Sequence, residues 1–272
     1  MDVDDDGLPI VEVGDWTREK HLRLRRYIDI SRAVRRKFTR PGRAGATYID
    51  LFCGPGRAHI RDTEEIIDGS PLVAVAEARC VGAPFTQILL GDVNPQYCAA
   101  VAARLHARDV EAAVFEGKAE DSVLRIAEQL NPHALHFAFL DPYNLEALPF
   151  SVIERLAQFK HMDILIHVSA MDLQRNLKQY LESAHCPLDL FAPGWRAAVD
   201  RRRRDESNRR SILDYWLHKV RELDMSPAQA IELVTGSRRQ PLYWLVFVAR
   251  HPLAGEFWEK IRDISPQRPL FS

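Results

Sequence analysis

The chain has 272 residues, 46% of them hydrophobic, and a formal net charge of −1 at pH 7. This length suits one elaborated α/β domain better than two small domains, and the hydrophobic fraction can fill a large core. No segment approaches the roughly 18 uncharged apolar residues of a membrane span, and the N-terminus is acidic where a secretory signal is basic, so we expect a cytoplasmic protein. The cysteines lie far apart without a Cys-x-x-Cys pair, which predicts no metal site and no disulfide framework: Cys53, Cys80, Cys98 and Cys186.

The N-terminal part divides into two predicted segments. Residues 1–14 are rich in aspartate and predict a disordered acidic lead. Residues 15–43 predict a basic N-terminal helix, because Thr17 is a good N-cap and the apolar side chains from Leu24 to Phe38 recur at helical spacing. The Pro-Gly pair at 41–42 ends this helix. We expect residues 15–272 to form one domain.

Strand-like and helical patterns then alternate. Apolar runs predict strands at 46–52, 86–91, 111–115, 135–140 and 163–168, and helical spacing predicts helices at 71–81, 95–107, 120–130 and 149–159. Such alternation predicts right-handed crossovers and a parallel sheet with helices on both faces. The predicted strands are apolar almost throughout, as a sheet covered on both faces requires.

The alternation stops after the fifth strand. Residues 169–226 predict a helical insertion, and two final strands follow at about 229–235 and 241–249. The short loop at 236–240 permits only antiparallel pairing of these two strands. A mostly parallel seven-stranded sheet closed by an antiparallel hairpin resembles the class I methyltransferases, whose fold is Rossmann-like.

Basic residues concentrate in two runs. Residues 18–43 carry eleven Lys or Arg against two acids, Glu19 and Asp29, and residues 196–210 carry seven arginines against three acids. Such runs are typical either of a solvated helix face or of a surface that contacts phosphates. The charge pattern alone leaves both interpretations open.

The residues after the first predicted strand have the spacing of a nucleotide-binding loop. Asp50 to Gly56 read Asp-Leu-Phe-Cys-Gly-Pro-Gly, in which Gly54 and Gly56 let the backbone turn and approach a ligand without a Cβ atom. We assign Phe52 to the same site and expect the Asp50 carboxylate to accept a hydrogen bond from an ammonium group. A dinucleotide fingerprint would need a third glycine at His59, so a nicotinamide cofactor is disfavoured.

The ends of the next two strands supply further candidates. Asp92 follows the second strand, where a carboxylate accepts both ribose hydroxyls of a nucleotide, and Asn94 is either a cofactor ligand or the N-cap of the next helix. After the third strand, Lys118 replaces the acid of a Gly-Asp-Ala sequence that often contacts adenine. Within that segment we assign Glu120 to the cofactor site.

The fourth predicted strand ends in Leu140-Asp-Pro-Tyr-Asn144. This resembles the Asp-Pro-Pro-Tyr signature of amino methyltransferases with one proline missing, which implies that Asp141 holds the target amine and that Tyr143 stacks on a base. We take both as candidate catalytic residues; the alternative is that they only shape a turn. Histidine and arginine just beyond the fifth strand, His167 and Arg175, are more often structural. The sequence contains no hydrolase or kinase motif.

Five separated motifs together resemble the three-Cys-motif partner protein family. They are Trp16-Thr17 with Lys20-His21, the Tyr48–Gly56 loop, Gly69-Ser-Pro-Leu72, Leu140-Asp-Pro-Tyr143, and Leu242–His251 with Phe257-Trp258. This resemblance covers residues 16–262 and implies a methyltransferase-like domain that uses S-adenosylmethionine. The family name refers to cysteines in a neighbouring partner protein.

These features favour an S-adenosylmethionine-dependent methyltransferase that acts on a nucleic acid or a nucleobase-like amine. The alternative is a non-catalytic Rossmann-like accessory module that binds nucleic acid or a partner protein. A third interpretation is that the same cofactor serves another group transfer.

Overall fold

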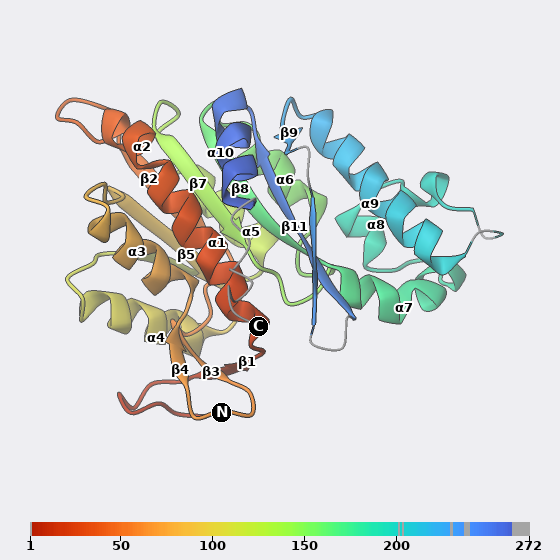
Figure 1. Cartoon of the computed structure of the whole chain (residues 1–272), viewed down its shortest axis with the longest axis horizontal. Coiled ribbons are helices and arrows are strands. Elements are labelled where there is room, and N and C mark those ends of the chain that lie inside the picture. Colours follow the sequence, from red (N-terminus) through yellow and green to blue (C-terminus); the bar gives the residue numbers. More distant parts are fainter. Residues whose placement is uncertain (1, 201, 203, 229–230, 237–239, 263–272) are drawn as a thin grey trace, which may run out of the picture.

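The computed structural model describes residues 2–200, 202, 204–228, 231–236 and 240–262 (Figure 1). Its main sheet has seven strands in one continuous path, in the order β10-β11-β8-β7-β2-β5-β6. Their bounds are Glu232–Thr235, Pro241–Ala249, Met162–Ser169, Leu135–Leu140, Ala46–Asp50, Gln87–Asp92 and Ala113–Glu116. The two-residue strand β9, Ser226–Pro227, also pairs with β11.

The strand directions are those predicted. The five strands β6, β5, β2, β7 and β8 are parallel. The last long strand, β11, pairs antiparallel with both β8 and β10. The predicted seven-stranded Rossmann-like sheet with a terminal antiparallel hairpin is therefore confirmed. Residues 229–230 of the predicted sixth strand and 237–239 of its connecting loop lie outside the described residues.

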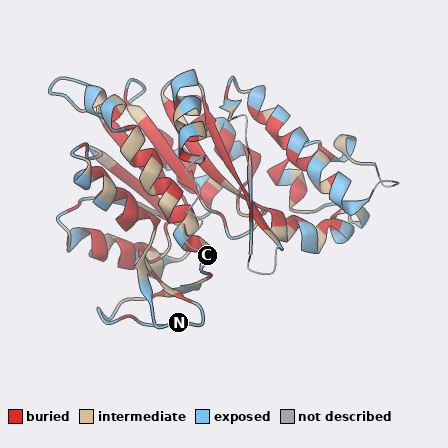
Figure 2. Ribbon diagram, in the orientation of Figure 1, coloured by how far each residue is buried: buried red, intermediate tan, exposed pale blue. Residues whose placement is uncertain are grey.

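Helices cover both faces of the sheet, and the strands between them are buried (Figure 2). One face packs against α1 (Trp16–Ile30), α3 (Ser70–Cys80), α4 (Pro95–His106) and α10 (Pro252–Arg262). The other packs against α5 (Ala119–Ala127), α6 (Phe150–Leu156) and the helices that follow β8. The carboxyl ends of the five parallel strands therefore open between two helical layers, where α/β sheets bind their ligands.

The segment after β8 forms a helical extension at one side of the sheet (Figure 1). It contains α7 (Ala170–Glu182), α8 (Leu188–Phe191), the 3₁₀ helix η1 (Trp195–Ala198) and α9 (Asp205–Arg221). Phe191 stacks on Trp216 with 5.3 Å between ring centroids, so the extension shares the apolar cluster of its sheet face. Arg201 and Arg203 of the second basic run lie outside the described residues.

The predicted N-terminal helix is divided at Ser31 into α1 and α2 (Arg32–Phe38). The Ser31 hydroxyl donates to the Tyr27 carbonyl at 2.7 Å, a local side-chain to backbone bond that competes with the helical ladder. The helical spacing of the apolar residues continues through this break, which is why the sequence predicts one helix.

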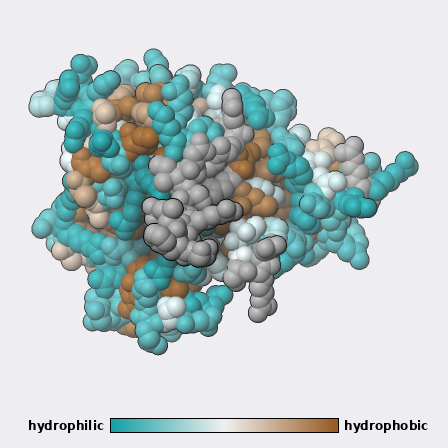
Figure 3. All heavy atoms as spheres, in the orientation of Figure 1, coloured by the Kyte–Doolittle hydropathy of each residue, from teal (hydrophilic) through white to brown (hydrophobic). Residues whose placement is uncertain are grey.

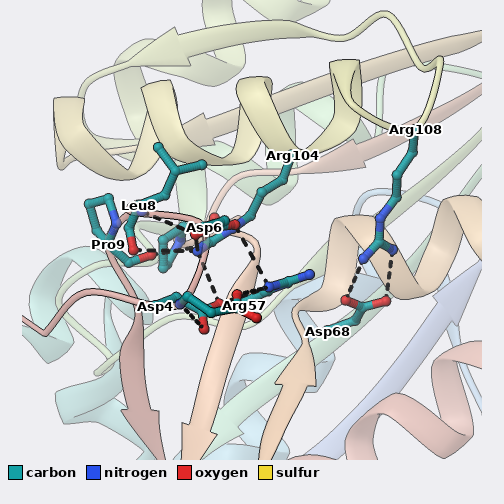
Figure 4. A network of polar contacts seen from close by, with 10 residues as sticks. Asp4, Asp6, Leu8, Pro9, Arg57, Asp68, Arg104 and Arg108 are labelled. Atoms are coloured by element: carbon teal, nitrogen blue, oxygen red, sulfur yellow. Dashed lines mark hydrogen bonds and ion pairs between the residues drawn. The ribbon is translucent and has the colours of Figure 1, made fainter.

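The segment before α1 differs from the disordered acidic lead that its composition suggests. In the described part, β1 (Val11–Val13) pairs with β3 (Arg57–Ile60), which pairs with β4 (Ile66–Asp68). Arg104 on α4 is buried and bonds Asp6 at 2.8 Å, while Arg57 bonds Asp4 at 3.0 Å (Figure 4). The acids order this segment because the buried Arg104 and the partly buried Arg57 neutralise them, a long-range pairing that composition does not reveal.

The carboxylates of Asp4, Asp5 and Asp6 lie within 4.8 Å of one another; Asp4 and Asp6 pair with both Arg57 and Arg104, and the exposed Asp5 pairs with Arg57. No helix among the described residues is long and apolar enough to cross a membrane. The four cysteines are all free thiols, as predicted.

Candidate active site

The loop after β2 is built around a buried carboxyl group. Asp50 has no exposed surface; its Oδ1 accepts from the Phe52 amide at 3.0 Å, and its Oδ2 accepts from the Ser70 hydroxyl at 2.7 Å and the Tyr48 hydroxyl at 3.1 Å. Burial raises the pKa of Asp50 to about 7, although these hydrogen bonds oppose the rise. Asp50 thus ties β2 to the start of α3.

This arrangement does not fit the ammonium contact expected of Asp50. A carboxyl group with three internal donors and no exposed surface has no face for a ligand. The sequence pattern correctly places an acid at the strand end, but its partner Ser70 lies 20 residues away in the chain. Only the fold shows that Asp50 supports the loop from within the protein.

The two glycines of the loop have different environments. Gly54 has φ 57°, and a Cβ atom there would meet nothing within 4 Å, so this backbone borders open space. Gly56 has φ 91°, and a Cβ atom there would lie 3.3 Å from Val101 Cγ2 and 3.4 Å from Arg104 Cδ on α4. Gly54 therefore leaves room beside the loop, whereas Gly56 lets the loop pack on a helix.

Asp92 joins the second strand to the same loop. Its Oδ2 accepts from the Gly54 amide at 3.0 Å and its Oδ1 from the Asn94 amide at 2.9 Å. Burial raises the pKa of Asp92, against the effect of the Asn94, Gly54 and Val93 backbone amides. Each oxygen keeps a second acceptor position, because a carboxylate oxygen has two lone pairs. The neighbouring Val93 is 68% exposed and offers an apolar surface at the same strand end.

The remaining predicted cofactor residues surround this corner. Asn94 caps α4, since its side chain accepts from the Gln96 amide at 2.9 Å. Glu120 lies in the first turn of α5, 3.9 Å from the Lys118 ammonium. Phe52 is half-buried and packs against one apolar cluster of the core. All three lie at or near the carboxyl edge of the sheet.

At the end of β7, Asp141 forms two strong polar contacts. Its Oδ2 accepts from Lys20 Nζ on α1 at 2.5 Å, and its Oδ1 is hydrogen-bonded to His167 Nδ1 on β8. Because an ionised carboxylate only accepts, His167 must carry its proton on Nδ1 in this pair. The Tyr243 ring packs edge-on against His167 with 4.2 Å between centroids, and Lys20 Nζ lies 5.5 Å from the same ring.

The charges of this cluster oppose one another. Burial disfavours ionised Asp141, but the Lys20 charge and the hydrogen bonds from His167 and Lys20 outweigh that effect and hold the pKa of Asp141 well below its usual range. Burial lowers the pKa of His167, and Asp141 only partly counteracts it. At neutral pH the site therefore holds a carboxylate, and an imidazole that is neutral and can accept a proton on Nε2.

Tyr143 lies two residues beyond Asp141 and is 92% exposed. The loop that carries Tyr143 is fixed to α7, because the Leu145 amide donates to Asp172 Oδ2 at 2.9 Å and Asp172 lies in the first turn of that helix. Tyr143 has no packing role in the core, so its ring is available at the edge of the site.

Sequence reasoning missed two members of this cluster. Lys20 and Tyr243 belong to motifs of the family resemblance, but nothing in the local pattern brings them to Asp141, which is 121 residues from Lys20. His167 was expected to be structural. The one available signal is that the Lys20-His21 pair belongs to the motifs of the family resemblance.

No family model and no curated protein matches this chain. Solved structures do match. A protein from Legionella pneumophila has 11% identity and a TM-score of 0.53, with 90% of this chain and 91% of that chain covered. An O-methyltransferase from Bacillus cereus, solved in complex with S-adenosylhomocysteine, also has 11% identity, with 90% and 85% covered and a TM-score of 0.52. At this identity the likeness concerns the fold, and the chain has the α/β Rossmann-like fold of class I methyltransferases.

Proposed function

We propose that this chain is an S-adenosylmethionine-dependent methyltransferase whose acceptor is a nucleic acid or a nucleobase-like amine. The observation that carries the proposal is the hydrogen bond between Asp92 and the Gly54 amide. This bond fixes Asp92, the acid proposed to bind the ribose hydroxyls, against the Gly54 loop, which would contact the rest of the cofactor. Both lie at the edge of the sheet where α/β folds bind nucleotides.

The residues present fit such a cofactor. The loop backbone at Gly54 borders open space, as close approach by a ligand requires. Asp92 is partly buried and retains acceptor capacity for two hydroxyls, and the exposed Val93 side chain can cover a purine face. Gly54, Gly56, Asp92, Asn94, Phe52 and Glu120 would then form the cofactor pocket, with Asp50 supporting the loop.

S-adenosylmethionine supplies a methyl group on a positively charged sulfur. The chain's own residues would orient the acceptor and take its proton. Asp141 can accept one more hydrogen bond on each oxygen, which suits an amine donor, and its negative charge is maintained by Lys20. An amine loses a proton when it is methylated, and the neutral His167 imidazole, oriented by Asp141, is the candidate acceptor of that proton.

A nucleobase is the favoured carrier of the amine because Tyr143 projects into solvent beside Asp141. Stacking of a base on an exposed aromatic ring contributes about 1–3 kcal/mol in single-strand binding proteins. Asp141 would thus accept a hydrogen bond from the amine, and Tyr143 would stack on the base that carries it.

Membership of the three-Cys-motif partner family is part of this proposal. Residues from its separated motifs meet around the site: Lys20 contacts Asp141, Ser70 contacts Asp50, and the Tyr243 ring contacts His167. These contacts between separated motifs support membership of the family. The proposal of a partner protein rests only on the family resemblance.

Isothermal calorimetry with S-adenosylmethionine tests the cofactor directly. The wild type should bind with micromolar or tighter affinity, and Asp92→Ala should weaken binding by at least about tenfold, because it removes the acceptor of two hydroxyl hydrogen bonds. Glu65→Ala, which removes an exposed acid between β3 and β4 from its pair with Arg18, is the matched control and should leave binding unchanged. Failure of the wild type to bind would refute the proposal.

Methyl transfer is tested with S-adenosylmethionine carrying a radioactive methyl group, incubated separately with bulk RNA and with denatured DNA. Asp141→Asn should abolish incorporation while it retains cofactor binding, and mass spectrometry of digested nucleosides should locate the methyl on an exocyclic amine. Asp163→Asn is the matched control, since this acid bonds Tyr27 at the amino end of β8, whereas the His167 contact with Asp141 lies near the carboxyl end of that strand. Cofactor binding without incorporation in any acceptor pool would favour the accessory module instead.

A further inference from the structure

The amino edge of the sheet carries a basic hollow of 580 Å³. It is lined by Lys37 and Phe38 from the end of α2, by the loop that follows, and by His133. This volume lies in the range of small-molecule sites and exceeds the space that a single ion needs. The hollow precedes β2 and β7 in the chain, so it lies at the opposite end of the strands from Asp141.

The loop that forms the hollow is internally fixed. The Arg43 amide donates to the Arg40 carbonyl at 3.0 Å, and the Gly45 amide donates to the Phe38 carbonyl at 2.9 Å. Gly42 and Gly45 adopt φ values of 75° and 90°, which favour glycine. The loop is also joined to the start of β7, because the Leu135 amide donates to the Gly45 carbonyl at 3.1 Å. Its cations are therefore presented by a closed turn.

The contacts of the first basic run, residues 18–43, distinguish the cations of this hollow from the others. Eight of its eleven cations interact within the protein: Arg18, Lys20, Arg23, Arg25 and Arg32 with carboxylates, Arg35 and Arg36 with backbone carbonyls, and Arg26 as well. The other three, Lys37, Arg40 and Arg43, form no side-chain hydrogen bond or ion pair within the described part of the chain. All three are exposed, and all three line the hollow.

One further positive charge, that of Lys160, lies close by. Burial lowers the pKa of His161, and Lys160, His251 and His133 lower it further. The His161 ring packs edge-on against Phe38 with 5.2 Å between centroids, so this group of side chains adjoins the hollow. In Figure 3 the corner that carries the loop, at the upper left, is mostly hydrophilic. Lys160 thus adds a positive charge near the three cations of the hollow, whereas the lowered pKa leaves His161 neutral at pH 7.

We propose that this amino-edge hollow binds the phosphate groups of a nucleic acid strand. Three cations spread over a 580 Å³ hollow suit successive phosphates better than one compact anion. The half-buried Phe38 adds an apolar wall beside them. The six residues of β7 place this surface about 20 Å from the candidate methyl-transfer site, so it is a separate contact and does not depend on transfer at Asp141.

Fluorescence anisotropy with a labelled 20-nucleotide single-stranded RNA tests the proposal on the full chain. The variant Lys37→Ala/Arg40→Ala/Arg43→Ala should weaken binding by at least about tenfold and lower the salt slope by about 2, because each neutralised phosphate of a single strand adds about 0.7 to that slope. The matched control is Lys178→Ala/Arg202→Ala/Arg204→Ala, which removes the same charges from exposed positions on the helical extension. It should change the affinity less than threefold.

Thermal unfolding and calorimetry with S-adenosylmethionine on the hollow variant keep the test independent of folding and of the proposed activity. Both should match the wild type, because the three side chains support no other described residue. Absence of RNA binding in the wild type would overturn the proposal, and so would an equal loss in the two triple variants. Displacement of the RNA by a mononucleotide at equal phosphate concentration would overturn the strand as ligand and assign the hollow to a free nucleotide.

Discussion

The buried Asp50 carboxyl should make the stability of the fold depend on pH in a defined window. Burial raises its pKa from 3.8 to about 7 in the folded protein. Between these two values the folded state binds more protons than the unfolded state, so stability contributed by this group is lost as pH rises toward 7 and above. Asp50→Asn removes this titration, because an amide stays neutral.

The magnitude follows from the shift. A rise of about 3 pKa units corresponds to about 4 kcal/mol, which is the penalty for holding Asp50 ionised at high pH. Between pH 6 and pH 8 the Asp50 contribution to the unfolding free energy falls by about 1.4 kcal/mol, because only the first pH unit of this interval lies below the folded pKa of about 7. Buried histidines with lowered pKa values, such as His21 at about 4, act in the opposite direction but equally in both proteins.

Urea unfolding of wild type and Asp50→Asn at pH 6 and pH 8 measures this directly. From pH 6 to pH 8, the difference between the unfolding free energies of the variant and the wild type should shift by about 1.4 kcal/mol in favour of the variant. The Asn amide can still accept from Phe52 and can donate to the Ser70 and Tyr48 oxygens, so cofactor affinity should change less than threefold. A constant difference between the two proteins, or loss of cofactor binding in the variant, would refute the role of Asp50 as a buried support of the loop.

Three further perturbations test other contacts. Deleting residues 1–9 removes the Asp4, Asp6 and Pro9 partners of buried Arg104 and should lower the unfolding free energy by about 3 kcal/mol; Arg104→Leu in the shortened chain should recover part of it. Arg35→Lys should cost about 2 kcal/mol in urea unfolding, since Arg35 is 1% exposed and its guanidinium bonds the Ala83 and Ile28 carbonyls. Gly54→Ala should cost only about 1–2 kcal/mol of stability for its positive φ, but calorimetry should show a larger loss of cofactor affinity because the added methyl enters the open space beside the loop.

The elements and their directions were predictable because their signals are local. Apolar runs of strand length alternate with helical spacing, and the short link after residue 235 permits only a hairpin. The same logic places Asp92 and Asp141 at strand ends, where the structure has them. These predictions required no knowledge of which segments touch.

The partners of the acids were not predictable in that way. Asp50 is satisfied by Ser70, Asp141 by Lys20 and His167, and Asp6 by Arg104, each across at least 20 residues of chain. Composition describes residues 2–14 as acidic and therefore solvated, but an acid beside a buried arginine is ordered by it. The error has one physical cause: charge counted along a chain does not show which charges are neutralised in space.

The first basic run illustrates the consequence. The 15 residues of α1 rise about 22 Å, close to the roughly 20 Å length of β7, so this helix spans the sheet from its carboxyl edge to its amino edge. Its early lysine, Lys20, meets Asp141 at one edge, and the loop after α2 presents Arg40 and Arg43 at the other. A run that resembles a uniform basic face in the sequence is therefore divided by the fold into cations that bond the protein's own acids and carbonyls and exposed cations without such a partner among the described residues. The second group needs to give up no internal bond to hold phosphates, which is why the triple variant at Lys37, Arg40 and Arg43, rather than removal of the whole run, isolates the proposed nucleic acid contact.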